Sequence, residues 1–523
     1  MTRGVVSGVL VAAVLLLAPA SASAITLAPL APAPTWGSPP MFLTAPSKDA
    51  RLFIAERSGV VRIAKGGTVL AQPFLTIPNV DTVSERGLQS IAFAPDYATS
   101  GLFYAFYTAG GPDSIDPSGV AGDIRVVEYQ RSADPDVAAG GRLVIKQAHG
   151  AGNHNGGQLA FGHDGLLYIT IGDNAVSANS QDLANLLGKV LRIDPRDPDG
   201  IGLQTYAIPA SNPFLTNPSA REEIYALGLR NPFRASIAPS GSLVVGDVGS
   251  GLNEEVNVLA AGGGNYGWPN CEGPCTPSNA AHADPFFSYP HSGPTVCAVI
   301  GGHVLRDFDL PELIGRYLYG DLCASDLRTL DLGAAGGDPS QSGALLPAGE
   351  SLQSFGESAG GCAYALTATN VYRVAPDAST PAQCPRSSIP IPETRGGALR
   401  DTTNPQLTLK LRKRQRLGRF VTLTARCSEA CTLRASGRLR FAAKPKAGAA
   451  KAPVKLRKAT RRVRANTGIR LRLRTTKPLR KRARNALKAK RGVVAEITVV
   501  ATDSARNSSR KRVRMKLLLP RRR

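Results

Sequence analysis

The feature that most constrains the fold is a strand-like pattern that recurs six times in the first 375 residues. Each repeat is a short run of apolar residues, rich in β-forming types or alternating with small and polar ones, and three of the runs contain Gly-Asp near their end. The runs cover residues 51–59, 101–108, 165–173, 241–249, 315–323 and 362–374. Similar strand units at intervals of roughly 50–75 residues are typical of a β-architecture repeated around an axis. The sequence therefore predicts an all-β first domain, a six-bladed β-propeller over residues 35–384.

A double β-sandwich is the alternative fold for this region. The irregular spacing of the runs and the length of the region favour blades joined by variable loops. Helical periodicity is nearly absent, and residues 181–191 are the best candidate for a helix. With 523 residues, the chain is also long enough for a second domain.

Residues 1–24 have the pattern of a signal peptide. Arg3 precedes an apolar run over residues 5–17, and small residues close the segment at Ala24. The alternative, a transmembrane anchor, requires about 20 apolar residues, and this run is shorter. The sequence therefore predicts a secreted or extracellular protein with no transmembrane segment after cleavage.

Cysteine usage agrees with export. All eight cysteines lie after residue 270, and an even number in an exported chain favours disulfide bonds. Cys271 with Cys275, and Cys427 with Cys431, are spaced to close short local loops. The other four can pair within the later part of the first domain, although eight cysteines allow 105 connectivities. Metal binding is the weaker interpretation, because no Cys-x-x-Cys spacing with histidine partners is present.

A second domain follows a segment over residues 385–404 whose Pro, Gly, Ser and Thr content is typical of a linker. Residues 405–523 contain about seven runs in which apolar residues alternate with basic or small ones. This period of two predicts half-buried strands, and it favours a small immunoglobulin-like β-sandwich over disorder. The charge-dense stretches 458–464 and 477–491 are predicted to be loops or edges.

Charge divides the two domains. From residue 401 onward there are 39 Lys and Arg against four acidic residues, a net charge of about +35, while the whole chain carries +24. A mildly acidic domain therefore carries a very basic one, which indicates an acidic partner. We expect an acidic cell-wall polymer or an anionic membrane surface, and hence association with the cell envelope. Nucleic acid is compatible with the charge, and a solubilising appendage is the alternative without a partner.

Three polar groups stand at or near predicted strand ends. His154, in the glycine-flanked loop GNHNGG, can accept a proton from a substrate hydroxyl, or else caps a turn. Arg230 and Asn231 follow an apolar run, where the guanidinium can polarise a carbonyl or form an ordinary salt bridge. Glu254 and Glu255 are adjacent in a glycine-rich loop, which suits a Ca²⁺ site or two solvated acids.

Six segments, taken in order along the chain, resemble the soluble glucose/sorbosone dehydrogenase family. They are residues 87–97, 153–173, 186–195, 224–233, 246–258 and 263–269. The resemblance covers about residues 35–375, so the basic domain lies outside it. It implies a propeller enzyme that oxidises an aldose or related sugar at the anomeric hydroxyl, with pyrroloquinoline quinone (PQQ) and Ca²⁺ as cofactors and an external electron acceptor.

The resemblance also implies roles for the chemical step. His154 matches the family's general base, which takes the proton from the anomeric hydroxyl while hydride passes to the quinone. Asn153 stands at the cofactor, where better-characterised members have an aspartate beside the base. Arg230 and Asn231 match residues that contact the quinone carbonyls. The two glycines after Asn155 are interpreted as room for a flat cofactor.

For the metal, Gly249 and Ser250 match positions whose backbone carbonyls hold the cofactor-linked Ca²⁺. Glu254 and Glu255, with the carbonyl of Tyr266, match a structural Ca²⁺ site. All of these roles follow from the resemblance.

Several family features are missing from this chain. Glu85 and Arg86 stand where the family offers a glutamine to the cofactor, and Val248 stands where the sugar-oxidising members have a glutamine. No lysine lies in residues 319–326, and the arginines that clamp the quinone carboxylates are absent around residues 354–361. A related branch resembles the propeller of Hedgehog-interacting proteins, and fold alone does not imply function. The alternative function is therefore a non-catalytic propeller that binds a glycan or a protein at the cell surface.

Overall fold

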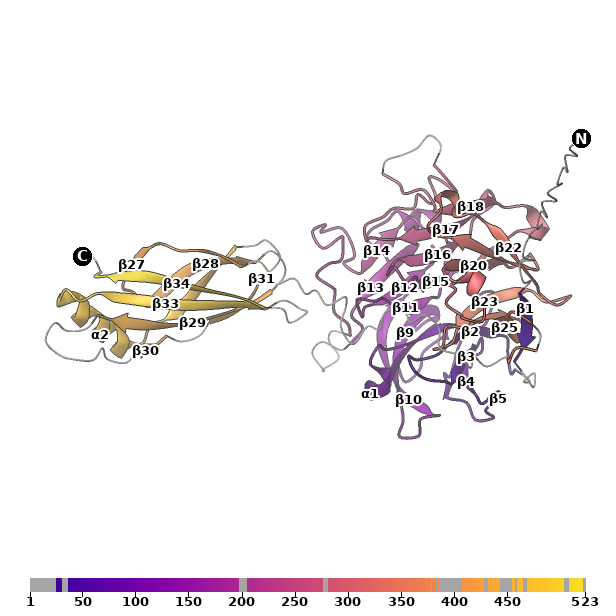
Figure 1. The fold of residues 1–523 in the computed structure, drawn as a ribbon, viewed down its shortest axis with the longest axis horizontal. Helices are drawn as coiled ribbons and strands as arrows, with labels where there is room; N and C mark the ends of the chain where they lie inside the picture. Colours follow the sequence, from indigo (N-terminus) through magenta and orange to yellow (C-terminus); the bar gives the residue numbers. More distant parts are fainter. Residues whose placement is uncertain are drawn as a thin grey trace, which may run out of the picture.

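The computed structural model describes residues 25–30, 36–196, 205–275, 281–377, 379–381, 384, 407–427, 431–442, 454–456, 459–463, 468–502 and 508–520. The predicted signal peptide and linker lie outside these residues. The regular secondary structure of the described chain is mainly β-strand, as predicted (Figure 1). Its helical segments are α1 (Tyr97–Ser100), α2 (Lys477–Lys488) and the short 3₁₀ turns Ser177–Ser180, Gly293–Thr295, Pro311–Leu313 and Ala335–Gly337. Nowhere in the described ranges is a helix long and apolar enough to cross a membrane.

Four sheets of the first domain have four antiparallel strands each, and strands that follow one another in sequence lie side by side. The first two sheets are β7 (Leu88–Phe93), β8 (Leu102–Gly110), β9 (Ala121–Arg131), β10 (Ala138–Gln147), and β11 (Leu159–Phe161), β12 (Leu167–Ile171), β13 (Lys189–Ile193), β14 (Ile224–Leu227). The next two are β15 (Pro232–Ile237), β16 (Leu243–Asp247), β17 (Asn253–Leu259), β18 (Phe287–Pro290), and β19 (Val299–Val304), β20 (Arg316–Asp321), β21 (Asp326–Asp331), β22 (Ser340–Leu345).

A nine-stranded sheet joins the two ends of the domain. It comprises β1 (Thr26–Pro29), β25 (Val371–Ala375), β24 (Ala363–Thr367), β23 (Leu352–Glu357), β2 (Pro40–Thr44), β3 (Leu52–Glu56), β4 (Val60–Lys65) and β5 (Thr68–Val69), with β6 (Leu75–Thr76) paired to β4. Its halves meet at a single parallel pair between β2 and β23, Leu43 with Gly356. The N-terminal strand β1 pairs with β25 and so completes the half formed by the end of the domain.

The six predicted runs occupy equivalent places in these sheets. They coincide with β3, β8, β12, β16, β20 and β24, each the second strand of a sheet or half-sheet. The first strands contact one another in succession, β2 with β7, then β11, β15, β19, β23 and back to β2. The apolar core is divided into clusters between neighbouring sheets, such as the one that joins Phe53, Phe74 and Phe103. The internal repeat is therefore structural as well as sequential.

The predicted helix over residues 181–191 is wrong. This stretch forms turns and then enters β13 at Lys189. The side chains of Asp182 and Asn185 each accept the backbone N–H two residues ahead, at 2.9 Å, and Gly188 adopts a φ of +67°. Side-chain bonds of this kind offer the backbone an alternative to helical bonding.

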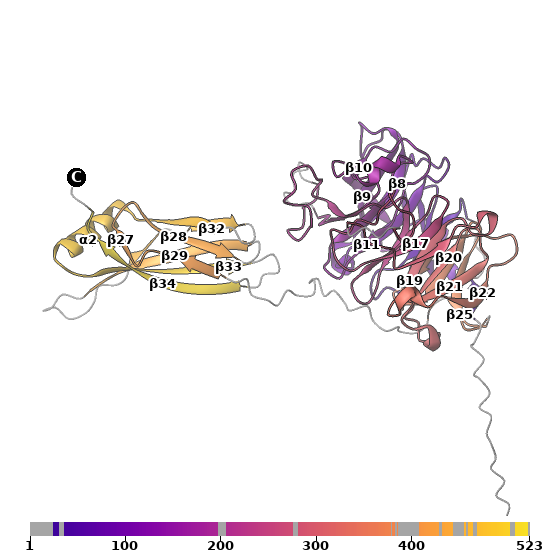
Figure 2. The ribbon, with the colours of Figure 1, turned by 90° about the horizontal axis from the view of Figure 1, so that it is seen from above.

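The basic domain contains two sheets that enclose one apolar core (Figure 2). The smaller sheet has β26 (Leu407–Lys410), β28 (Phe420–Cys427) and β32 (Gly468–Arg474). The larger sheet has β27 (Arg414–Arg416), β34 (Ser508–Leu518), β33 (Val493–Thr502), β29 (Cys431–Phe441) and β30 (Val454–Lys455), with β31 (Ala459–Val463) paired to β29. The predicted strands are present, while the immunoglobulin-like topology stays a prediction.

The stretch 477–491, predicted to be a loop or edge, instead forms the helix α2 over most of its length. The Thr476 side chain accepts the N–H of Leu479, and a proline occupies the first turn. Leu479, Ala483 and Ala486 are buried, at the i, i+4, i+7 spacing of an amphipathic helix. The sequence contains this apolar spacing, but the many Lys and Arg residues between these positions led to the prediction of a loop.

Disulfide bonds join Cys271 to Cys275, Cys297 to Cys323 and Cys362 to Cys384. These pairs agree with the local loop and the later-domain pairing expected from the sequence. Cys427 is also disulfide-bonded. Its bond to Cys431 stays a prediction, because the Cys431 side chain lies outside the described part.

Candidate active site

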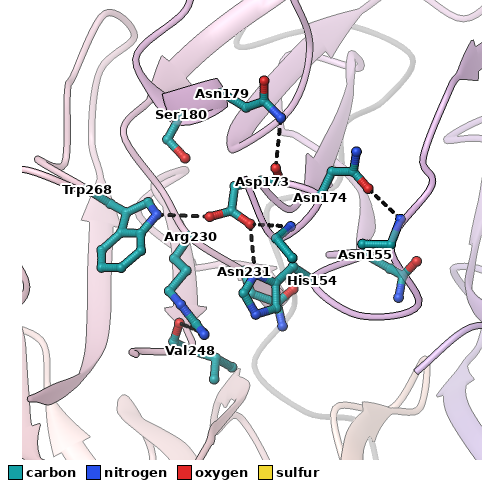
Figure 3. Close-up of polar contacts among 12 residues, drawn as sticks. His154, Asn155, Asp173, Asn174, Asn179, Ser180, Arg230, Asn231, Val248 and Trp268 are labelled. Carbon is teal, nitrogen blue, oxygen red and sulfur yellow. Dashed lines mark hydrogen bonds and ion pairs between the residues drawn. The ribbon is translucent and has the colours of Figure 1, made fainter. Parts of the chain in front are cut away.

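His154 lies in the loop between β10 and β11, beside the end of β12, and its ring contacts a carboxylate. Its Nδ1 is 2.7 Å from Oδ1 of Asp173, whose side chain is only 1% exposed (Figure 3). His154 adopts a φ of +55°, and Asn174 and Ala175 next to Asp173 also have positive φ. Such backbone conformations cluster where a structure holds functional groups in place.

The Asp173 carboxylate is held from three sides. Its Oδ1 accepts the N–H of Ala175 at 2.8 Å, and its Oδ2 accepts the indole N–H of Trp268 at 2.9 Å. An ionised carboxylate only accepts, so this network assigns the imidazole proton to Nδ1. The other ring nitrogen, Nε2, has no hydrogen-bond partner among the described residues. His154 is thus oriented as a proton acceptor.

Asp173 was missed as a functional residue in the sequence, where Asn153 left His154 without a carboxylate neighbour. The signal was present in the Gly-Asp pair at the end of the strand β12. The Asn153 side chain is half-buried and makes no hydrogen bond with the described chain.

The His154 backbone is tied to two other groups. Its N–H donates to Oε2 of Glu85 at 2.9 Å, and its carbonyl lies 3.0 Å from Nε2 of His149. The buried His149 ring also contacts the Ala151 carbonyl at 3.0 Å, and burial lowers the pKa of His149. Arg86 pairs with Asp81 and donates to the carbonyls of the same loop. Glu85 and Arg86 therefore anchor this loop.

The glycines of GNHNGG serve packing, which corrects the expectation that they leave room for a cofactor. A Cβ at Gly156 would lie 2.7 Å from the Thr170 carbonyl oxygen, and one at Gly157 would lie 2.6 Å from Cβ of Gln89. Both glycines also have positive φ, +65° and +126°. Only glycine lets this loop lie so close to β12 and β7.

Arg230 and Asn231 form the turn between β14 and β15 and complete the site around His154. Their backbone N–H groups donate to the two oxygens of Asp247, at 3.0 and 2.7 Å. The Asn231 side-chain oxygen accepts the N–H of Gly156 at 3.0 Å, which links this turn to the His154 loop. The role of Asn231 seen here is therefore to hold the loop.

The Arg230 guanidinium is fixed on one side and open on the other. Its Nη1 donates to the Val248 carbonyl at 3.0 Å, and its carbon lies 5.6 Å from the centre of the Trp268 ring. Trp268 therefore contacts both the Asp173 carboxylate and the Arg230 cation (Figure 3). Within the described ranges no acidic side chain pairs with Arg230, so its remaining N–H groups can meet a ligand.

Glu254 and Glu255 alternate along β17 and point to opposite faces, as neighbours on a strand do. Glu254 accepts the N–H groups of Gly249 at 3.1 Å and Val299 at 2.9 Å and contacts His291 at 2.9 Å. The structure thus engages Glu254 with protein donors and does not bring both carboxylates to one face. Tyr266 is buried, and this burial raises the pKa of its hydroxyl to about 12.

Glu255 instead faces Asp247 across β16 and β17. Burial, followed by the mutual repulsion of the two acids, raises the pKa of Asp247 well above its usual value, and burial raises the pKa of Glu255 to about 7. Asn257 donates to Glu255 at 3.2 Å, and its own buried side-chain oxygen accepts no hydrogen bond from the described residues. Clustered oxygen atoms of this kind are the donors that Ca²⁺ prefers.

The loop at Gly249 and Ser250 is held by a glutamate from the disulfide loop between Cys271 and Cys275. Oε1 of Glu272 accepts four successive N–H groups, from residues 250 to 253, at 2.7, 2.8, 2.8 and 3.1 Å. Burial opposes ionisation, but these four donors outweigh it and lower the pKa of Glu272. No N–H of the described chain donates to the carbonyls of Gly249 or Ser250, so both are available to a ligand.

The cations near residues 354–357 are already engaged. Arg234 is fully buried and donates to the Ser354 hydroxyl at 2.8 Å. Arg306 forms an ion pair with Glu357 at 2.6 Å. The described residues of this region therefore offer no counterpart to the family's arginine clamp.

Comparison with known proteins relates the first domain to a family. The family model described as Glucose / Sorbosone dehydrogenase matches residues 38–373. HIPL1 protein of Arabidopsis thaliana is 29% identical over 349 residues, which are 53% of this chain and 50% of that protein. Aldose sugar dehydrogenase YliI of Escherichia coli is 33% identical over 222 residues, 42% of this chain and 55% of that protein. The chain thus spans about half the length of these curated relatives.

Among solved structures, the PQQ-bound form of the aldose sugar dehydrogenase of Streptomyces coelicolor has a TM-score of 0.52. It is 23% identical and covers 66% of this chain and 97% of its own, so the likeness shows the fold. The first domain accordingly has the β-propeller fold of these proteins. The family model matches more than half of the sequence, and the chain therefore belongs to the glucose/sorbosone dehydrogenase family.

Proposed function

We propose that this protein is a PQQ- and Ca²⁺-dependent dehydrogenase that oxidises an aldose or related sugar at the anomeric hydroxyl. The observation that carries the proposal is the His154–Asp173 pair, with Nε2 of the imidazole open and the Arg230 guanidinium beside the same Trp268 ring. The family membership supports sugar oxidation.

In this proposal His154 takes the proton of the anomeric hydroxyl on Nε2. Asp173 keeps the ring in the required tautomer and stabilises the imidazolium that forms, as a carboxylate behind a catalytic histidine does. Arg230 supplies a permanent positive charge where negative charge develops. PQQ, when bound, supplies the redox chemistry by accepting the hydride, and an external acceptor then removes the electrons.

The residues present fit the quinone edge of the cofactor. Arg230 retains free N–H groups, and the carbonyls of Gly249 and Ser250 are unpaired in the described chain, which suits a cofactor-linked cation. Glu272 holds that loop in place by accepting the N–H groups of residues 250–253. The carboxylates of PQQ lack a cationic clamp near residues 354–357, so we expect weaker binding than a clamped site would give.

For the structural Ca²⁺ site we infer a set centred on Glu255, with Asp247 and the unpaired oxygen of Asn257. Two acids that repel one another when buried, next to an orphaned oxygen, gain stability from a cation. Glu255 and Asp247 also accept backbone N–H groups, from Gly273 and from Arg230 and Asn231. Glu254 points to the opposite face of β17 from Glu255 and in addition contacts His291, so its place in this set is secondary.

We also infer that the first domain has six blades. The ring of contacts among the six first strands supports this count, with the nine-stranded sheet counted as two blades that meet at Leu43 and Gly356. Secretion is part of the proposal, and the three disulfide bonds among the described cysteines support it.

A second candidate function is a propeller that binds a glycan or protein without catalysis. The engagement of Arg234 and Arg306 by neighbouring residues favours it, because no clamp is left there for the cofactor carboxylates.

The test is reconstitution of the purified protein with PQQ and Ca²⁺, followed by dye reduction with a panel of aldoses. The proposal predicts sugar-dependent reduction that a His154→Ala variant loses by about 10²–10⁴-fold. Absence of any quinone absorbance shift at micromolar PQQ would favour the binding function. Undiminished activity in His154→Ala would remove the assigned base.

A further inference from the structure

Two rows of positive charge lie on the outer face of the larger sheet in the basic domain, flanked by Arg414 on β27 and Lys455 on β30. Strands β34 and β29 flank β33 in this sheet (Figure 1). Their alternate residues point away from the core, which takes Met515 and Leu517 of β34 and Leu433 and Leu439 of β29. The outward cations are Arg510, Arg512, Arg514 and Lys516 on β34 and Arg434, Arg438 and Arg440 on β29.

The strand register sets these cations opposite one another across β33. The facing sets are Arg434, Val500 and Arg510; Arg438, Glu496 and Arg514; and Arg440, Val494 and Lys516. Neighbouring strands are about 4.8 Å apart and alternate residues about 6.7 Å apart, so the rows lie about 9.5 Å from one another. The short side chains of β33 form the floor of a track between them.

Glu496 shows how this track holds an anion. Its carboxylate binds Arg438 at 2.9 Å and Arg440 at 2.7 Å from one row, and Arg514 at 3.0 Å from the other. It is the only acidic residue among the described residues of the basic domain. Arg434, Arg510 and Lys516 therefore have no acidic partner in the described chain.

We propose that this track binds a linear anionic glycopolymer linked by phosphodiesters, whose phosphates occupy the outer sets as the Glu496 carboxylate occupies the middle one. Rows about 9.5 Å apart suit a single extended chain. The outward described residues of β29, β33 and β34 include no aromatic side chain, whereas single-stranded nucleic acid is held by stacking on aromatics. This inference is independent of the proposed dehydrogenase activity.

The test measures binding of the full-length protein to poly(glycerol phosphate) of defined length over a range of NaCl concentrations. The track variant is Arg434→Gln/Arg510→Gln/Lys516→Gln. The matched control is Arg470→Gln/Arg472→Gln/Arg474→Gln on β32, which removes the same charge from exposed positions of the other sheet. We expect the track variant to bind at least about tenfold more weakly, with the slope of log Kd against log salt reduced by about 2, at ~0.7 per phosphate contact. The control should change by less than about threefold.

A second variant guards against a folding defect. Glu496→Gln removes the built-in anion, so it should bind the polymer a few-fold more tightly, a gain that misfolding cannot produce. Equal losses in the track and control variants would overturn the proposal, since charge alone would then explain binding. Tighter binding to oligo(dT) of equal charge, or to phosphatidylglycerol vesicles, would assign the surface to nucleic acid or membrane instead.

Discussion

Two buried glutamates, one in each domain, meet opposite environments. Glu255 and Glu496 are 6% and 5% exposed. Glu255 faces Asp247, no cation of the described residues contacts it, and burial raises its pKa to about 7. Glu496 contacts three arginines, Arg440 foremost, and its pKa falls to about 2. Glu255 and Asp247 are therefore buried acids that a cation would stabilise, and we propose a metal ion for them. Arg434, Arg510 and Lys516, near Glu496, are cations without an acidic partner in the described chain, and we propose a polyanion for them.

The largest expected effect is a loss of activity on substitution of Asp173. This first-domain carboxylate accepts hydrogen bonds from Ala175 and Trp268 and contacts His154. Asp173→Asn keeps the shape but removes the charge that fixes the tautomer and stabilises the imidazolium. We expect kcat to fall by about 10²–10⁴-fold. Asp182→Asn, which preserves a nearby turn, is the control and should retain activity. Equal activity in both variants would show that Asp173 only supports the loop.

Calcium should distinguish the two neighbouring glutamates of β17. A cation that binds the folded protein at 100 times its Kd stabilises it by about 2.7 kcal/mol. The wild type should therefore melt at a higher temperature in Ca²⁺ than in EDTA, and Glu255→Gln should lose this difference. Glu254→Gln should retain most of it, because Glu254 points to the opposite face of β17 from Glu255 and contacts His291. A shift lost in Glu254→Gln and kept in Glu255→Gln would reverse our assignment.

The pH dependence of stability should have opposite signs in the two domains. The pKa of Glu255 is raised from 4.5 to about 7 in the folded protein. Between these values the folded state holds a proton that the unfolded state has lost, so stability falls as pH rises. Urea unfolding in EDTA, followed by tryptophan fluorescence, should show this fall and its flattening in Glu255→Gln. Both tryptophans, Trp36 and Trp268, lie in the first domain. If Glu255→Gln leaves the slope of stability against pH unchanged, the pH dependence arises from another group.

Glu496 should give the smallest effect, because its arginine partners are 41–71% exposed and exposed ion pairs are weak. Its pKa is lowered from 4.5 to about 2, so its contribution is present above pH 4.5 and lost as pH falls toward 2. Over that range the protection factors of the β33 amides, which correct for the pH dependence of intrinsic exchange, should fall in the wild type. Glu496→Gln should reduce this dependence; a response identical to the wild type would contradict the comparison.

The sequence predicted what depends on local pattern. The six runs mark equivalent strands because each strand's apolar alternation reflects its own burial. His154 and Arg230 are predicted from motif order, and the structure connects both to Trp268, His154 through Asp173 and Arg230 directly. The helix α2 is not predicted, because the dense positive charge of its sequence favours a loop, although Leu479, Ala483 and Ala486 have helical spacing.

What the sequence did not reveal depends on distant contacts. Asp173 meets His154 only because the turn between β11 and β12 folds residues 19 apart together. The partner of Glu255 is set by strand register, which places it opposite Asp247. Gly156 and Gly157 are interpreted from the sequence as room for a ligand, but Thr170 and Gln89 lie where their Cβ atoms would be. Spacing along the sequence does not reveal which distant residues come into contact, so these three contacts could not be predicted.

The most direct test of the central claim is a single-turnover experiment on protein loaded with PQQ and Ca²⁺. Wild-type protein should bind PQQ stoichiometrically, and an aldose added without an electron acceptor should bleach the quinone absorbance. His154→Ala should bind PQQ with similar affinity yet bleach about 10²–10⁴-fold more slowly. Failure of the wild type to bind PQQ, or equal bleaching rates in both proteins, would contradict the account.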